Sequence, residues 1–345
     1  MRTILTISCL TLAVACGSTP PPAPAPVAAP EPAPAPEAEP APAEPTAEEL
    51  KKQADDAAAR AKLEKLEVDA KAERDRWTDE MRAAVKKLSE TAHPNAQVGL
   101  SRALKSAHRL PGHAERDKAR RPLETMKFLG LRPTMTVMEV GGGDGWYTEI
   151  LAPVVAKGGK LIVTALDPAG PETAPGTFYG RRFKHYIDKS EELSGKVEVV
   201  IVDPKDLQLG HAGEVDLAFA FREMHNWHRR GRRVPHNLAQ VFAALKPGGT
   251  FGVVQHRAAA GSNPDDTAEK GYLPEAWVIE QAQAVGFVLS GKSEINANKL
   301  DTKDHPEGVW TLPPILRLGD KDRDKYVAIG ESDRMTLKFS KPKKK

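Results

Sequence analysis

The stretch Val137-Met138-Glu139-Val140-Gly141-Gly142-Gly143-Asp144-Gly145-Trp146-Tyr147 decides the fold. A short apolar run that ends in an acidic residue leads into a glycine loop, and a helical pattern follows. Glycine has no Cβ, so a ligand can lie against the backbone at positions 141, 143 and 145. Backbone N–H groups at the start of the next helix can face a polar or anionic group. The pattern predicts nucleotide-type cofactor binding at the carboxyl end of a parallel strand.

The spacing acid-x-Gly-x-Gly-x-Gly, with the acid inside the strand, differs from the dinucleotide fingerprint, whose acid ends the next strand. It resembles the first motif of class I S-adenosylmethionine-dependent methyltransferases. The resemblance implies that Glu139, Gly141, Gly143 and Gly145 contact S-adenosylmethionine. A glycine cluster by itself also fits a tight turn, so the rest of the chain has to decide between these interpretations.

From residue 92 to residue 345, apolar β-branched runs alternate with helical patterns, which predicts a mostly parallel sheet with helices on both faces. We expect strands over 136–140, 160–166, 197–203, 215–221, 250–255, 287–293 and 335–339, and helices over 115–129, 146–155, 236–245 and 274–285. An antiparallel pair at the end resembles the methyltransferase sheet. The predicted fold is therefore α/β: a Rossmann-like class I methyltransferase fold, a seven-stranded, mostly parallel sheet with an antiparallel last strand, preceded by a helical stalk.

Two acidic residues follow the second and third expected strands. Asp167 closes the second strand, where a carboxylate can accept hydrogen bonds from the ribose hydroxyls of an adenosine. Asp206 follows the third strand, and the resemblance implies that a polar residue here meets the adenine amino group. The competing interpretation for both is turn formation, because each lies close to an Asp-Pro pair, Asp167-Pro168 and Asp203-Pro204.

Polar and aromatic residues crowd the end of the fourth strand, in the run Arg222-Glu223-Met224-His225-Asn226-Trp227-His228. This is the edge at which α/β sheets place their ligands. We expect a methyl acceptor to approach here, with His225 as the general base and Glu223 or His256 as secondary candidates. Trp227 either forms an apolar wall of the pocket or packs in the core.

The pair His225-x-x-His228 also permits a metal site, because helical spacing of three residues can bring two imidazoles to one ion. His256 or His305 would add a third ligand. A metal-dependent hydrolase is thus a minor alternative, and our preferred interpretation includes no metal.

The resemblance extends over roughly 107–340, to a bacterial family of predicted class I methyltransferases, many of them exported. Its pieces are the run Arg109-Leu110-Pro111-Gly112-His113-Ala114-Glu115-Arg116-Asp117, the glycine loop through Pro153, the polar run at 221–227, His256-Arg257 and Asp304-His305. Arg116 and Asp117 either belong to an exposed charged helix or fold over the cofactor mouth. The resemblance implies methyl transfer and no particular substrate.

The amino terminus predicts export. Residues 1–16 combine Arg2, an apolar core and a small-residue cleavage site, which is typical of a signal peptide. Cys16 resembles the lipidated cysteine of a bacterial lipoprotein, although an ordinary secretory peptide is the alternative. Residues 17–46 are rich in Pro, Ala and Glu and predict an extended tether. We therefore expect a membrane-anchored lipoprotein of the cell envelope, although S-adenosylmethionine is made in the cytoplasm.

Residues 47–91 predict a charged helical stalk that opens with a capping box at Thr46 and whose later half packs on the domain. Self-association through this stalk is a minor hypothesis. The chain has two cysteines, Cys9 and Cys16, so the domain itself has no disulfide and no cysteine-based metal site. A net charge of +3 does not indicate a nucleic-acid partner, and the basic tail at 341–345 fits a solvated terminus.

The sequence thus supports two functions of different classes. The first is an enzyme that moves a methyl group from S-adenosylmethionine to an O or N nucleophile of a small-molecule or envelope-associated acceptor. The second is a non-catalytic, envelope-anchored binding module built on a methyltransferase fold.

Overall fold

The computed structural model describes residues 17, 22–23 and 45–343. The chain divides into two units, residues 1–46 and 47–345, and the fold described below is that of the second unit. The predicted signal peptide at 1–16, Cys16 and most of the predicted tether lie outside the described residues. In the part that is described, no helix has both the length and the apolar character needed to cross a membrane.

The second unit is built on one seven-stranded sheet with the order β3-β2-β1-β4-β5-β7-β6. Its strands are β1 Thr136–Val140, β2 Lys160–Ala165, β3 Val197–Ile201, β4 Val215–Phe221, β5 Leu245–His256, β6 Val288–Ser293 and β7 Arg334–Ser340. The first five run parallel, whereas β7 is antiparallel to both of its neighbours, β5 and β6. The predicted fold class, with its antiparallel last strand, is confirmed.

Side chains that alternate along the strands form a separate core on each face of the sheet. Val137, Leu161 and Leu217 belong to one core, and their neighbours Met138, Ile162 and Ala218 belong to the other. Helices cover both faces, so the strands are apolar on both sides, as a parallel sheet requires.

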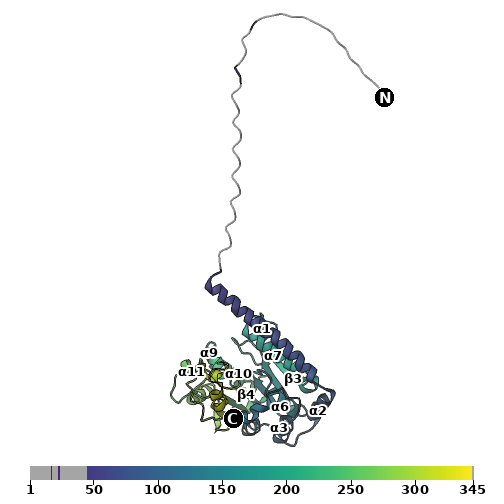
Figure 1. Ribbon diagram of the computed structural model, residues 1–345. Helices are drawn as coiled ribbons and strands as arrows, with labels where there is room; N and C mark the ends of the chain where they lie inside the picture. Colours follow the sequence, from purple (N-terminus) through teal and green to yellow (C-terminus); the bar gives the residue numbers. More distant parts are fainter. Residues whose placement is uncertain (1–16, 18–21, 24–44, 344–345) are drawn as a thin grey trace, which may run out of the picture. The chain divides into compact units, whose positions relative to one another are not determined.

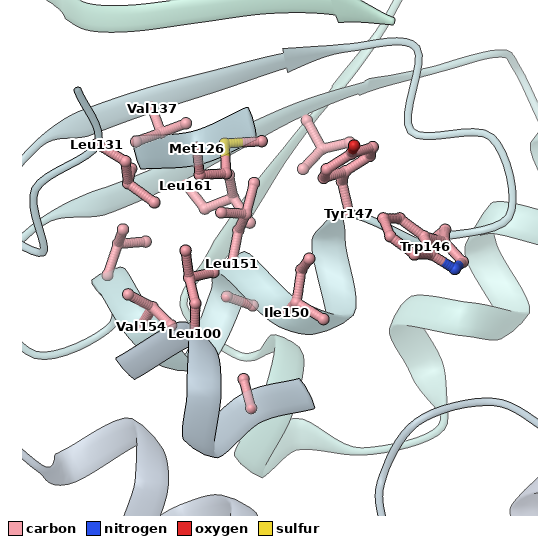
Figure 2. Packing of buried hydrophobic residues seen from close by; sticks show 14 of the residues in the cluster. Leu100, Met126, Leu131, Val137, Trp146, Tyr147, Ile150, Leu151, Val154 and Leu161 are labelled. Carbon is pink, nitrogen blue, oxygen red and sulfur yellow. The ribbon is translucent and has the colours of Figure 1, made fainter. Parts of the chain in front are cut away.

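The first face is covered by α2 Asp79–Glu90, α3 Ala96–Leu104, α5 Pro122–Leu129, α6 Thr148–Val155, α7 Pro175–Asp188 and the short α8 Glu191–Ser194. Figure 2 shows side chains of α3, α5 and α6 gathered against Val137 of β1 and Leu161 of β2. The second face is covered by α9 Met224–Arg229, α10 Val234–Ala244 and α12 Glu275–Val285. Apart from α1, described next, the other helices are α4 Asp117–Arg120, α11 Pro264–Ala268, α13 Arg323–Ile329 and the 3₁₀ turns Ala114–Arg116 and Gly308–Thr311.

The helical region expected over 47–91 is two helices, α1 Ala47–Arg76 and α2. The break falls at Trp77, whose buried ring donates its Nε1–H to Glu73 (3.0 Å), and at Thr78, whose hydroxyl accepts the Met81 N–H and caps α2. α1 lies alongside α7 (Figure 1), with Glu67 paired to His185 and Glu73 paired to Lys189.

The helix expected over 115–129 is also interrupted. Arg121 adopts a left-handed backbone with φ 42° and separates α4 from α5. The cause is Pro122, which disfavours a helical residue before it and starts a new helix at its own position.

The chain between β6 and β7, residues 294–333, is far longer than a hairpin turn, and we call it the β6–β7 segment. It contains the second 3₁₀ turn and α13, and the sequence did not predict its structure. Its ends are adjacent, because Ser293 of β6 pairs with Thr336 of β7.

Candidate functional site

A cavity of about 390 Å³ opens at the carboxyl ends of β1, β2, β4 and β5. This is where doubly wound sheets bind ligands, and the volume suits a small molecule. Its walls come from the glycine loop, α7, the β4–α9 connection, the end of β5 and the β6–β7 segment. Of the predicted site residues, the cavity lining includes Glu139, Gly141, Gly143, Glu223, His225 and His256.

The three glycines of the loop share a positive φ but meet different surroundings. A Cβ on Gly141 would lie 2.8 Å from the Glu223 side chain, and a Cβ on Gly145 would lie 2.6 Å from the Tyr186 ring. At Gly143, with φ 60°, the nearest atom would be 4.0 Å away, so this position faces open space. Gly143 is thus the point where a ligand can lie against the loop, while the other two glycines are required by packing.

Glu139 ends β1 as a buried carboxyl group. It accepts a hydrogen bond from the Thr148 hydroxyl (2.7 Å) at the start of α6. Burial raises the pKa of Glu139 to about 8 in spite of this bond, and the nearby charge of Asp144 adds to the rise. The group is therefore mostly protonated at neutral pH.

Asp144 has the opposite character, although it belongs to the same loop. Its carboxylate lies 3.8 Å from His113 and 3.6 Å from Arg116. Burial would raise the pKa of Asp144, but the charges of His113, Arg182 and Arg116 outweigh it and hold that pKa below its usual value. The loop thus presents one neutral acid and one ionised acid.

A network of buried charges fixes the segment at 108–117 against the start of α6. Glu149 accepts Arg109 Nε–H (2.8 Å) and lies 3.0 Å from His113 Nδ1, and Arg109 also pairs with Asp117 (2.5 Å). Burial would raise the pKa of Glu149, but these partners hold it below its usual value. Arg116 lines the cavity, whereas Asp117 supports Arg109 behind it.

Neither Asp167 nor Asp206 has its side chain in the cavity. Asp167 is exposed and accepts the Ala169 N–H (2.8 Å), which forms a turn through Pro168. Asp206 is 62% exposed and pairs with His236 (3.2 Å). The lining at these strand ends consists instead of Thr164–Leu166 at the end of β2 and of Val202, Pro204 and Leu207 after β3. Asp167 and Asp203 each accept a backbone N–H two residues on, so both Asp-Pro pairs form turns. Contact of Asp167 and Asp206 with a cofactor stays a prediction.

Glu223 is positioned by an unusual backbone. Arg222, at the end of β4, has φ 62°, a conformation that non-glycine residues rarely adopt and that occurs often at functional sites. The turn places the Glu223 side chain against Gly141. Burial raises the pKa of Glu223 to about 7, although a bond from Asn226 and the charge of Arg230 act in the other direction.

The two histidines among the predicted bases are neutral; His225 is buried and His256 is half-buried. His225 Nδ1 contacts Gln255, and burial lowers the pKa of His225 to about 3. His256 Nδ1 contacts the Ser332 hydroxyl (2.5 Å), and burial together with His225 lowers the pKa of His256 well below its usual value. Imidazoles of such low basicity accept protons poorly, so Glu223 matches the demands on a general base better than either histidine.

The metal site considered for His225 and His228 is contradicted. His228 pairs with Asp265 (2.7 Å), while His305 pairs with Asp301 (2.9 Å). Among the residues that the structure describes, no group of three His, Cys, Asp or Glu side chains could hold a metal ion.

Sequence reasoning missed the aromatic and basic walls of the cavity. Tyr147, Phe219 and Phe221 form an aromatic cluster with ring centroids 4.6–5.7 Å apart. Trp227 is buried in the second core and also borders the cavity, so it combines both expected roles. Further lining residues come from parts of the chain that no motif marked, namely Tyr179, Arg182, Arg229, Arg230, Trp310 and Arg317.

The sheet order, with β7 inserted antiparallel between β5 and β6, identifies the architecture. The chain has the class I methyltransferase fold. No protein-family model matches it, and no curated protein matches it significantly.

Solved structures with similar folds include methyltransferases. An S-adenosylmethionine-dependent methyltransferase from Aquifex aeolicus is 17% identical over 66% of this chain and 93% of its own, with a TM-score of 0.41. One from Mesorhizobium loti is 14% identical over 63% and 95%, with a TM-score of 0.39. A geranyl diphosphate methyltransferase in complex with S-adenosylmethionine is 13% identical over 70% and 90%, with a TM-score of 0.43. Likenesses of this size do not determine the reaction, which has to be inferred from the residues of this chain.

Proposed function

We propose that this methyltransferase-fold protein transfers a methyl group from S-adenosylmethionine to an O or N nucleophile of a small-molecule or envelope-associated acceptor. One observation supports this above all others. A single cavity brings the open backbone of Gly143 together with the buried carboxyl group of Glu223, whose pKa is about 7.

The glycine loop fits the cofactor. Gly143 leaves room above the backbone, while Thr164 fixes the loop by accepting the Gly141 N–H (2.8 Å) through its hydroxyl and the Gly142 N–H (3.0 Å) through its carbonyl. Glu139, Gly143 and Asp144 would hold S-adenosylmethionine, with the ionised Asp144 suited to an ammonium group. When bound, the cofactor supplies an electrophilic methyl group on a positively charged sulfur.

The chain's own contribution is to position the acceptor and to accept its proton. Glu223 is about half ionised near pH 7, so its carboxylate can take a proton from a hydroxyl or amine. Tyr147, Phe219 and Phe221 supply an apolar wall that excludes water from this part of the cavity. Holding the acceptor in a reactive geometry lowers the barrier further.

We also propose that the protein acts in the bacterial cell envelope, held by a lipid on Cys16 and by the Pro-rich tether. The sequence of residues 1–46 supports this proposal. Pairing of two chains through α1 remains a prediction, for which the exposed Leu50 and Val68 are candidate contacts.

Calorimetric titration of the full chain with S-adenosylhomocysteine tests the cofactor site. We expect micromolar binding by the wild type and at least a hundredfold loss in Gly143→Val, because the added side chain fills the space above the loop. Gly210→Val is the matched control, since Gly210 has φ 62°, open surroundings and no place in the cavity lining. Absence of binding by the wild type would favour the non-catalytic binding module.

Once a methyl acceptor is found, Glu223→Gln tests the base. We expect turnover to fall about 10²- to 10⁴-fold while affinity for S-adenosylhomocysteine stays within about threefold. His225→Asn should have the smaller effect, because the neutral imidazole is a weak proton acceptor. A larger loss in His225→Asn than in Glu223→Gln would restore histidine as the base.

A further inference from the structure

The cavity is lined by more positive than negative side chains. Its lining contains seven arginines, listed as Arg116, Arg120, Arg182, Arg222, Arg229, Arg230 and Arg317, and four acids, Glu139, Asp144, Glu223 and Glu331. Burial raises the pKa values of Glu139 and Glu223, so only part of this negative charge is present at neutral pH. The cavity therefore has an excess of positive charge.

These arginines divide into paired and unpaired groups. Arg116 and Arg120 share Glu331, and Arg317 lies 3.6 Å from Glu307 at a half-exposed site. Within residues 45–343, no carboxylate lies in ion-pair range of Arg182, Arg222, Arg229 or Arg230. Arg230 is exposed, whereas Arg182, Arg222 and Arg229 are partly buried. Partly buried cations without an ion pair are costly, which makes the presence of three of them in one cavity informative.

Two of the arginines, Arg229 and Arg317, lie against one aromatic ring, that of Trp310. With Arg230, which follows Arg229 in the chain and also lines the cavity, we call them the arginine cluster. The Arg229 guanidinium lies 5.3 Å from the centre of the Trp310 ring, and the Arg317 guanidinium lies 4.8 Å from it. Stacking of this kind uses the faces of the guanidinium groups. Stacking leaves the N–H edges of these groups free to donate, and the terminal N–H groups of Arg229 match the paired oxygens of a carboxylate or phosphate.

The cluster is electrostatically strained. Burial lowers the pKa of Arg229, and the charges of Arg230 and Arg317 lower it further against the opposing effect of Glu269. Arg229 donates its Nε–H to the neutral oxygen of Asn226 (3.1 Å), which does not compensate the charge. An anion between these side chains would relieve their mutual repulsion.

The cofactor does not carry enough negative charge to neutralise these arginines. S-adenosylmethionine has one carboxylate, whose charge is balanced by its ammonium group, and its sulfonium adds a positive charge. The arginine cluster also comes from α9 and the β6–β7 segment, whereas the proposed cofactor residues come from β1 and the loop after it. The surplus of positive charge is thus left for the second ligand.

We infer that the methyl acceptor is a small anion with a carboxylate or phosphate group, which the arginine cluster binds beside Trp310. This inference rests on the proposed methyl transfer and narrows its substrate class. Arginine at these positions stays charged at any physiological pH, so the cluster keeps its positive charge throughout that range.

Tryptophan fluorescence of the full chain tests the inference with two probes, inorganic phosphate and malonate, at constant ionic strength. We expect at least one probe to change the emission of the wild type and of Arg233→Gln, an exposed arginine outside the cavity lining. The double variant Arg229→Gln/Arg230→Gln should bind that probe at least tenfold more weakly. Trp310→Phe should lose most of the spectral change, and the tighter probe identifies the acidic group.

Calorimetry with S-adenosylhomocysteine on the same variants separates this inference from the proposed function. We expect the double variant to bind it within threefold of the wild type. If neither anion binds, or if the double variant binds the anion as well as the wild type does, the inference of an anionic acceptor is wrong. The proposal of methyl transfer is unaffected by either result as long as the wild type binds S-adenosylhomocysteine. A tenfold loss of S-adenosylhomocysteine affinity in the double variant also overturns it, because the cluster then serves the cofactor. If the wild type binds the anion but does not bind S-adenosylhomocysteine, the anion is not a methyl acceptor.

Discussion

The two walls of the cavity are made in different ways. The glycine-loop wall, residues 139–147, is one short stretch that is packed into the core through Tyr147 and Trp146. The arginine cluster brings together α9 and a distant part of the β6–β7 segment, and two of its three charges, those of Arg229 and Arg230, have no carboxylate in ion-pair range among residues 45–343. A local motif thus specifies the cofactor side, whereas tertiary folding assembles the acceptor side. Substitutions in the two walls should therefore differ in what they damage.

The largest effect is expected from Gly145→Val. Its side chain would meet the Tyr186 ring and would also require a left-handed backbone, so we expect the free energy of unfolding to fall by about 3–5 kcal/mol. Gly143→Val incurs the backbone cost alone, about 1–2 kcal/mol. Denaturant unfolding measures both. Equal losses would show that the glycines of this wall do not differ as their surroundings indicate.

The second effect concerns the pH dependence of stability. Since the folded pKa of Glu139 is raised to about 8, the folded state holds a proton that the unfolded state has lost, and stability falls as pH rises toward 8. Between pH 6 and pH 9 the wild type should lose about 3 kcal/mol more than Glu139→Gln, which keeps the contact with Thr148. Denaturant unfolding at both pH values checks this.

Glu280→Gln, at an exposed position of α12, is the control for that experiment and should follow the wild type. If Glu139→Gln loses as much stability as the wild type between the two pH values, Glu139 is not the buried neutral acid described above.

The smallest effect is expected in the other wall. Arg229→Gln removes a partly buried cation that has no carboxylate partner, and it gives up a stacking contact worth about 0.5–1 kcal/mol. Removal of the unpaired charge stabilises the protein and loss of the stacking contact destabilises it, so the free energy of unfolding should change by less than about 1 kcal/mol. A loss of about 3 kcal/mol or more in thermal or denaturant unfolding would mean that Arg229 serves stability rather than binding.

The sequence predicted the sheet and the glycine loop well, because both rest on local patterns. All seven strands were placed, and β1 and β4 were placed with their observed bounds. The glycines were also recognised. Gly141 and Gly145, however, are required because their backbones pack against side chains far away in the sequence, and no local pattern reveals such contacts.

The chemistry of the site was harder to predict, because it depends on burial. His225 was favoured as the base by residue type, with Glu223 and His256 as secondary candidates. The lowered pKa values of both histidines make them neutral and leave Glu223 as the better candidate. Trp310 and Arg317 could not be placed, since the long β6–β7 segment has no periodicity that fixes its course.

The position of the β6–β7 segment has a consequence for how such a protein can diversify. Its ends belong to two paired strands, so the chain leaves the sheet and returns to nearly the same place. Loop-closure entropy grows slowly with length, by about 0.6 kcal/mol for each doubling. Longer, shorter or wholly different segments can therefore replace this one at little thermodynamic cost. Such replacements would change the residues that line the acceptor side of the cavity and leave the glycine loop intact.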